Sequence, residues 1–143
     1  MANPLATVPL IEESTANDRV KAIFADIRAT KGIDFVPAFW RALANQPDLL
    51  EGTWQHLKRV MHPEAVGRTS RLDARMRETI AVAVSATNGC SYCVNSHSAA
   101  LKKLGVDVET LGEIMSVVAL FNATNALAEG FQIEPDVRPN FEA

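Results

Sequence analysis

The sequence predicts an all-α fold of about six helices. Apolar residues recur at helical spacing along most of the chain, capping residues and prolines mark helix starts, and glycines mark helix ends. We identify no strand-like alternation of apolar and polar residues and no internal repeat, so we expect no strands. At 143 residues, the chain is expected to form a single domain over residues 1–143.

The first helix is expected to run from a capping pair at Thr15 and Asp18 to Gly32. Its apolar residues fall at helical spacing on one face: Val20, Ile23, Phe24 and Ile27. This pattern predicts an amphipathic helix that packs against the rest of the fold.

Two prolines begin the next two helices. Pro37 begins a short helix that carries Trp40, and Pro47 begins a longer one that carries Trp54 and ends at His62. We expect both tryptophans to be packing residues rather than parts of a substrate site.

The fourth helix is expected to begin after a cap within 70–73 and to carry Glu78. From Ile80 to Ala86 every residue is apolar or small, which predicts burial on all faces of the helix. Asn88 and Gly89 then form a helix stop.

A fifth helix is expected to begin near Cys90 and to stop at Gly105, and a sixth, capped by Asp107, to run to Gly130. We find no periodicity in the tail, residues 131–143. It is expected either to clasp a neighbouring subunit or to be loose.

The composition is typical of a soluble globular protein, with 48% hydrophobic and 22% charged residues. Fourteen basic and 17 acidic residues give a net charge of −3, so we expect no nucleic acid partner. Residues 1–13 lack the features of a signal peptide, and we find no segment that approaches the ~20 residues of a membrane span. We therefore expect a cytoplasmic protein with no membrane partner.

Residues 78–97, ETIAVAVSATNGCSYCVNSH, contain both cysteines of the chain. Cys90 and Cys93 are three residues apart, which on a helix separates their Cα atoms by about 5 Å and permits a disulfide. His97 lies four residues after Cys93, where helical side chains are neighbours, so its imidazole can approach that sulfur. This pattern predicts a redox-active thiol pair.

Glu78 would lie about 18 Å from Cys90 in one continuous helix. Because Asn88 and Gly89 stop the helix, we expect the next helix to return antiparallel to it, which brings Glu78 within about one turn of His97. The carboxylate, directly or through one water, would then hold the imidazole in the tautomer that accepts a proton from Cys93.

The residues alone leave three questions open. Cys90 is nearer to the helix N-terminus, which favours a thiolate, whereas Cys93 has the histidine, so either can be the nucleophile. The two cysteines can also be buried packing residues. A zinc site is the competing chemical interpretation, and it would need ligands from His97, Glu78, His56 or His62.

The pattern Glu-x11-Cys-x2-Cys-x3-His resembles the active-site signature of the alkylhydroperoxidase D-like group within the carboxymuconolactone decarboxylase superfamily, over about residues 47–130. The resemblance implies an alkylhydroperoxidase D-like helical bundle. It also implies that Cys93 attacks the peroxide, Cys90 resolves the product, His97 is the base and Glu78 orients it. Some relatives have a histidine directly before the second cysteine, where this chain has Tyr92, so a proton transfer assigned to that histidine does not carry over.

By the same resemblance we expect a thiol-dependent peroxidase that reduces organic or hydrogen peroxides. It would need no metal or bound cofactor, an external dithiol such as a lipoyl-type protein would reduce it, and it would form a homo-oligomer, a trimer or hexamer. The alternatives are a carboxymuconolactone decarboxylase-like enzyme or a non-enzymatic redox-sensing oligomer. Decarboxylases of the superfamily generally lack the cysteine pair, which favours the peroxidase.

Overall fold

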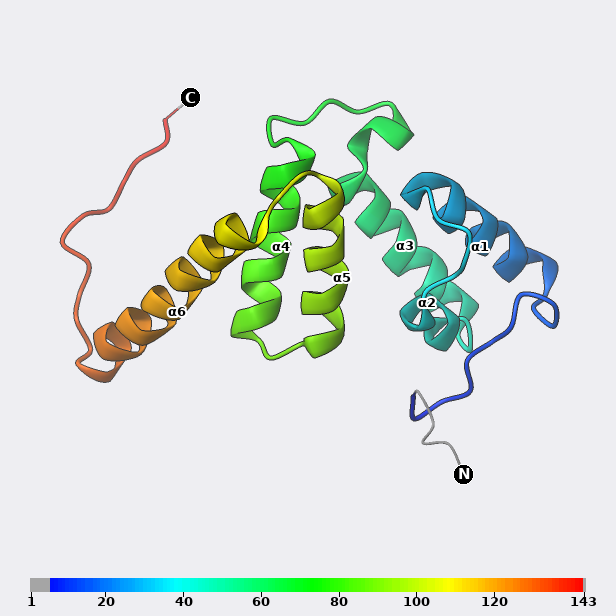
Figure 1. The fold of residues 1–143 in the computed structure, drawn as a ribbon, viewed down its shortest axis with the longest axis horizontal. Helices are drawn as coiled ribbons and strands as arrows, with labels where there is room; N and C mark the ends of the chain where they lie inside the picture. Colours follow the sequence, from blue (N-terminus) through cyan, green and yellow to red (C-terminus); the bar gives the residue numbers. More distant parts are fainter. Residues whose placement is uncertain (1–5, 143) are drawn as a thin grey trace. The chain divides into compact units, whose positions relative to one another are not determined.

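The computed structural model describes residues 6–142, and within them it contains six α-helices, one short 3₁₀ helix and no strand (Figure 1). The all-α prediction is confirmed for this part of the chain. The first five residues of the 1–13 segment lie outside the described residues. The chain divides into two compact units, the first ending at Arg71 and the second beginning at Leu72. Each unit is described by itself.

The first unit contains α1 (Asp18–Lys31), α2 (Ala38–Leu43), α3 (Pro47–Met61) and the 3₁₀ helix η1 (Pro63–Val66). Asn17 rather than Thr15 or Asp18 caps α1, because its side chain accepts a hydrogen bond from the backbone N–H of Val20. The helix ends as expected at Gly32, which has a left-handed φ of 62°.

A continuous apolar core holds the first unit together. Phe24, Ile27 and Trp54 are fully buried, and the ring of Trp40 meets that of Trp54 edge to face at 5.3 Å between centroids. The indole N–H of Trp54 donates to Asp26 at 2.7 Å, and Lys58 pairs with the same carboxylate. Both tryptophans therefore pack in the core, as the sequence predicts.

The second unit contains α4 (Ala74–Thr87), α5 (Ser91–Lys103) and α6 (Val108–Gly130). Its buried core is small and centres on Val82, Leu101 and Val106. The expectation that α4 is buried on all faces is wrong for the single chain, because Ile80 and Val84 are about half exposed. Among the described residues of this unit, α5 and α6 are the elements that pack substantially on α4, which leaves part of its apolar surface uncovered.

The last helix, α6, is 23 residues long and has no buried residue. By length and composition alone it is apolar enough to cross a membrane, which corrects the statement that no segment approaches a span. A helix that is apolar on all sides is normally covered. In the described chain only α4 contacts it substantially.

Candidate active site

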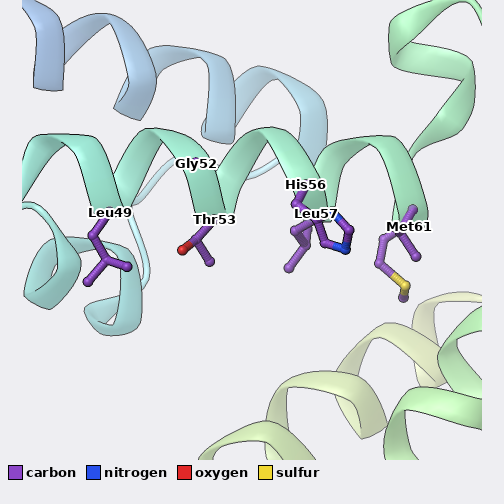
Figure 2. Close-up of a pocket in the computed structure, with 7 residues that line it drawn as sticks. Leu49, Gly52, Thr53, His56, Leu57 and Met61 are labelled. Carbon is purple, nitrogen blue, oxygen red and sulfur yellow. The ribbon is translucent and has the colours of Figure 1, made fainter.

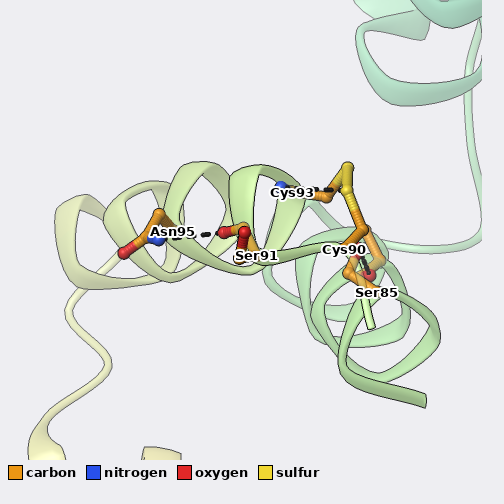
Figure 3. The surroundings of a disulfide bond; sticks show 6 residues. Ser85, Cys90, Ser91, Cys93 and Asn95 are labelled. Carbon is orange, nitrogen blue, oxygen red and sulfur yellow. Dashed lines mark hydrogen bonds between the residues drawn. A yellow bond between two sulfur atoms is a disulfide. The ribbon is translucent and has the colours of Figure 1, made fainter. Parts of the chain in front are cut away.

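The turn between α4 and α5 positions the two cysteines. Asn88 ends α4, and Gly89 follows with a φ of 72°, a left-handed conformation that glycine adopts without a steric penalty. The backbone N–H of Cys90 donates to the carbonyl of Ser85 at 3.0 Å, which closes the turn (Figure 3). As a result, α5 returns alongside α4 (Figure 1).

Cys90 and Cys93 form a disulfide, with their Cα atoms 5.3 Å apart. Cys90 is the N-cap of α5, and its sulfur accepts a hydrogen bond from the backbone N–H of Cys93 at 3.3 Å (Figure 3). Both residues are partly exposed, so neither sulfur is sealed in the core. The pair is therefore linked, accessible and at the start of a helix.

Glu78 of α4 and His97 of α5 meet across the two helices. The Oε2 atom of Glu78 lies 2.6 Å from Nδ1 of His97, and the side chains are 15% and 26% exposed. The predicted proximity of these two residues is therefore present as a direct contact. With Nδ1–H donating to the carboxylate, Nε2 is the nitrogen of the neutral imidazole that can accept a proton.

The four residues thus form one constellation in the second unit. Cys93 and His97 lie one helical turn apart on the same face of α5, and Glu78 contacts the imidazole from α4. A thiol, a base and a carboxylate that orients the base are the components of an activated nucleophile.

Two supporting features were not anticipated from the sequence. The carbonyl of Ser85 fixes the backbone of Cys90, and only the hydrogen-bond pattern of the turn identifies it. Arg77, next to Glu78, is 7% exposed and donates from Nη1 to the carbonyl of Leu72, so it ties the loop before α4 to the helix that carries the carboxylate. Burial of this kind is unusual for an arginine, and it could not be predicted from the sequence.

Other candidate residues stand apart from this constellation. His56 and His62 belong to the first unit, and the ring of His62 lies 6.5 Å from that of Trp54. Within residues 6–142, no group of three histidine, cysteine or acidic side chains is close enough to hold a metal ion. Tyr92, between the cysteines, is 47% exposed.

Comparison with known proteins places the chain in a family. The sequence profile of the carboxymuconolactone decarboxylase family matches residues 47–133, which is more than half of the chain and includes all four site residues. The chain belongs to this family. Within it, the chain is alkylhydroperoxidase D-like, because the relatives described next carry that name.

The solved core of alkylhydroperoxidase AhpD from Rhodospirillum rubrum is 44% identical, with a TM-score of 0.83, covering 93% of this chain and 96% of that one. Alkyl hydroperoxide reductase AhpD from Streptomyces griseus is 46% identical over 46 residues, which are 32% of this chain and 26% of the relative. The AhpD of Gluconacetobacter diazotrophicus is 31% identical over 84 residues, covering 57% and 45%. The chain thus spans less than half the length of these two reductases.

Proposed function

We propose that this family member is a thiol-dependent peroxidase that reduces organic or hydrogen peroxides through Cys90 and Cys93. The observation that carries the proposal is the Glu78–His97 contact of 2.6 Å on the helix pair that holds the linked cysteines. A carboxylate that orients an imidazole one turn from a thiol is the arrangement that activates a sulfur nucleophile. The names of the AhpD relatives support the same reaction class.

The peroxide step begins with the reduced pair. His97 accepts the thiol proton of Cys93 at Nε2, and Glu78 stabilises the resulting imidazolium. The thiolate attacks one peroxide oxygen, the O–O bond breaks, and the departing alkoxide or hydroxide takes the proton from His97. The sulfur is now a sulfenic acid, which condenses with the Cys90 thiol to give the disulfide and water.

The reductive step uses the other cysteine differently. A thiolate of an external dithiol attacks the sulfur of Cys93, the disulfide breaks, and Cys90 leaves as a thiolate. Its departure is favoured because its sulfur already accepts the N–H of Cys93 at the N-terminus of α5. The second thiol of the reductant then attacks the mixed disulfide and releases Cys93.

The remaining expectations belong to this proposal. The cycle uses no bound metal or cofactor, and a dithiol or lipoyl-type protein supplies the electrons. We propose a cytoplasmic homo-oligomer, with neither nucleic acid nor membrane as a partner. That residues 1–143 form a single domain, as inferred from the length of the chain, also stays a prediction.

Titration of the thiols tests the proposal directly. The reduced protein is treated with one equivalent of cumene hydroperoxide, free thiols are counted, and the peptide containing both cysteines is analysed by mass spectrometry. In the wild type we expect both thiols to be lost to an intramolecular disulfide. The Cys93→Ser variant should show no dithiol-dependent turnover, and its circular dichroism spectrum should stay as helical as that of the wild type. Retained turnover in Cys93→Ser, or two unreacted thiols, would refute the assignment.

The family match also supports a second candidate, a carboxymuconolactone decarboxylase-like reaction. The two candidates differ in their need for the thiols, since decarboxylation leaves the oxidation state of sulfur unchanged. Release of CO₂ from carboxymuconolactone that continues after alkylation of both cysteines would favour the decarboxylase.

A further inference from the structure

Ser85 is a buried serine on the side of α4 that packs against α5. It is 8% exposed and lies seven residues after Glu78, so the two side chains share one face of the helix. Glu78 contacts His97 of α5 from that face. The groove between α4 and α6 is lined by other residues of α4, among them Val84 and Thr87. Ser85 therefore lies on the side of the thiol pair.

The turn after α4 determines which side chain Ser85 meets. The N–H of Gly89 donates to the carbonyl of Ala86 at 3.3 Å, and the N–H of Cys90 donates to the carbonyl of Ser85 at 3.0 Å. With Gly89 in the left-handed conformation, these two bonds form a Schellman motif. The side chains at the two ends of this motif frequently make an apolar contact. Here the two ends are a hydroxyl and a sulfur, those of Ser85 and Cys90, which lie next to each other in Figure 3.

In the disulfide form, the Ser85 hydroxyl has a partner other than sulfur. It donates to the backbone carbonyl of Ala81 at 2.7 Å, one turn back along α4. The same carbonyl is the helical acceptor for the backbone N–H of Ser85. It therefore keeps one hydrogen bond when the hydroxyl turns away, so the hydroxyl can change partners without leaving a carbonyl unpaired.

Reduction places a negative charge beside this hydroxyl. In the proposed reductive step, a thiolate of the external dithiol attacks the sulfur of Cys93, and the electron pair of the broken S–S bond leaves on Cys90. The backbone N–H of Cys93 already donates to the Cys90 sulfur at 3.3 Å. A hydroxyl binds a charged acceptor more strongly than it binds a neutral carbonyl. The thiolate is therefore the better partner for Ser85 once the disulfide is open.

We propose that the hydroxyl of Ser85 is a second hydrogen-bond donor to the sulfur of Cys90, and that it switches from the carbonyl of Ala81 when the disulfide opens. Rotation of the serine side chain between staggered positions would exchange the two acceptors. The inference rests on the proposed function, since it gives Ser85 a role in the reductive half of that cycle. It also separates the two sulfurs, because Cys93 has the imidazole of His97 and Cys90 has the hydroxyl.

The titratable groups around Cys90 do not include Ser85. On α4 and α5 they are Glu78 and His97, which are paired with each other, and Tyr92 in the first turn of α5. The residues of α6 that pack on the core of this unit are apolar: Leu111, Ile114 and Met115. Removing the hydroxyl therefore leaves the charges of the site in place, and a change in the ionisation of Cys90 reports the hydroxyl.

Alkylation of Cys90 as a function of pH tests the inference without any peroxide. In the Cys93→Ser variant Cys90 is the one remaining thiol of the chain, and iodoacetamide reacts with its thiolate. Adding Ser85→Ala should move the alkylation profile to higher pH and lower the ionisation constant of the thiol about tenfold, as expected for the loss of a hydrogen bond to a charged group. Alanine favours helix, so we expect α4 to fold, and circular dichroism checks this.

Three further variants in the same Cys93→Ser background serve as controls. Ser85→Thr keeps a hydroxyl and should keep the profile. Ser116→Ala removes an exposed hydroxyl of α6 that donates to the carbonyl of Gly112 at 2.9 Å, the same bond to the preceding turn that Ser85 makes. Thr53→Val removes a hydroxyl from the apolar groove of about 640 Å³ along α3 in the first unit (Figure 2). We expect neither of these two to move the profile.

Single-turnover kinetics of the chain with both cysteines separate the two halves of the cycle. Ser85→Ala should slow reduction of the disulfide by dithiothreitol about threefold or more, because the leaving thiolate is less stable. It should change the rate at which one equivalent of cumene hydroperoxide is consumed by less than about twofold, because Cys93 is the attacking sulfur.

The outcomes distinguish this inference from the proposed function. An alkylation profile of Ser85→Ala that stays in place or moves to lower pH would overturn the inference. An equal shift in Ser116→Ala, or a folded Ser85→Thr variant with the alanine profile, would also overturn it. If the profile shifts as expected but the wild type does not lose its thiols to peroxide, the hydrogen bond is supported and the peroxidase is refuted.

Discussion

The two units of this chain differ in what they contain. The first has a continuous core around Trp40 and Trp54 and ion pairs between α1 and α3, but no thiol. The second has the thiol pair, its histidine and its carboxylate, but a core of only three buried apolar residues and an uncovered α6. Reactivity and self-sufficient packing therefore lie in different parts of the sequence. Four experiments test this difference between the two units.

The largest effect is expected from the site in the second unit. His97→Asn should lower the rate of peroxide reduction by about 10²–10⁴-fold, because the proton acceptor for Cys93 is lost. Glu78→Gln should lower it less and shift its pH profile, since the imidazole stays but its charged partner is gone. The matched control is Glu113→Gln, an exposed carboxylate of the same unit. If Glu113→Gln slows peroxide reduction as much as Glu78→Gln does, the contact between Glu78 and His97 does not explain the lower rate.

The next effect concerns stability and lies in the first unit. Trp54→Ala should lower the free energy of unfolding by about 3–5 kcal/mol, because it leaves a large cavity and removes a hydrogen-bond donor to Asp26. Val82→Ala in the second unit should lower it by about 2 kcal/mol for the lost buried methyl groups. Urea denaturation followed by circular dichroism measures both. Equal losses would contradict the difference between the two cores.

A smaller effect distinguishes the two cysteines. When the oxidised protein is treated briefly with glutathione and then alkylated, mass spectrometry should find the adduct on Cys93 rather than Cys90 by about 10 to 1 or more. A preference of that size needs only about 1.4 kcal/mol, within the range of a hydrogen bond to a charged group. In 6 M urea, where α5 is unfolded, the preference should disappear. A preference for Cys90 in the folded protein would mean that the capping contact does not direct the reductant.

The smallest effect is expected from pH in the first unit. Burial opposes ionisation of Asp26, but the hydrogen bonds from Lys58 and Trp54 and the charge of Lys58 outweigh it, so the pKa of this carboxyl is below its usual 3.8. Its contribution to stability is therefore present above about pH 4 and is lost as the pH falls through the lowered pKa. Asp26→Asn should remove this acid-dependent loss, worth at most about 1 kcal/mol. Parallel pH curves for the variant and the wild type would contradict the prediction.

The fold could be predicted where local signals determine it. Pro47, Asp73, Gly89, Gly105 and Asp107 each mark a helix boundary through backbone restriction or a side-chain cap, and the structure has boundaries at or next to them. The 3₁₀ helix at Pro63–Val66 was not predicted, because four residues are too few to show periodicity. The burial of α4 was overestimated because an apolar sequence does not say how much of a helix its own unit covers.

The contact at the candidate site followed from the same local signals. Counting residues away from the turn at Gly89 placed Glu78 near His97, and a regular helix pair preserves that count. The capping role of the Cys90 sulfur could not be predicted, because it depends on the backbone angles of a single residue. In residues 131–142 apolar and polar residues alternate, contrary to the expectation of a tail without periodicity, but the segment has two prolines and forms no strand in the structure.

The thiol pair closes a very small loop, with only two residues, Ser91 and Tyr92, between the linked cysteines. Chain-entropy arguments assign such a short loop a stabilisation of only about 2 kcal/mol, compared with about 4.7 kcal/mol for a loop of 100 residues. Opening and closing the link would therefore change the reactivity of the protein much more than its resistance to unfolding.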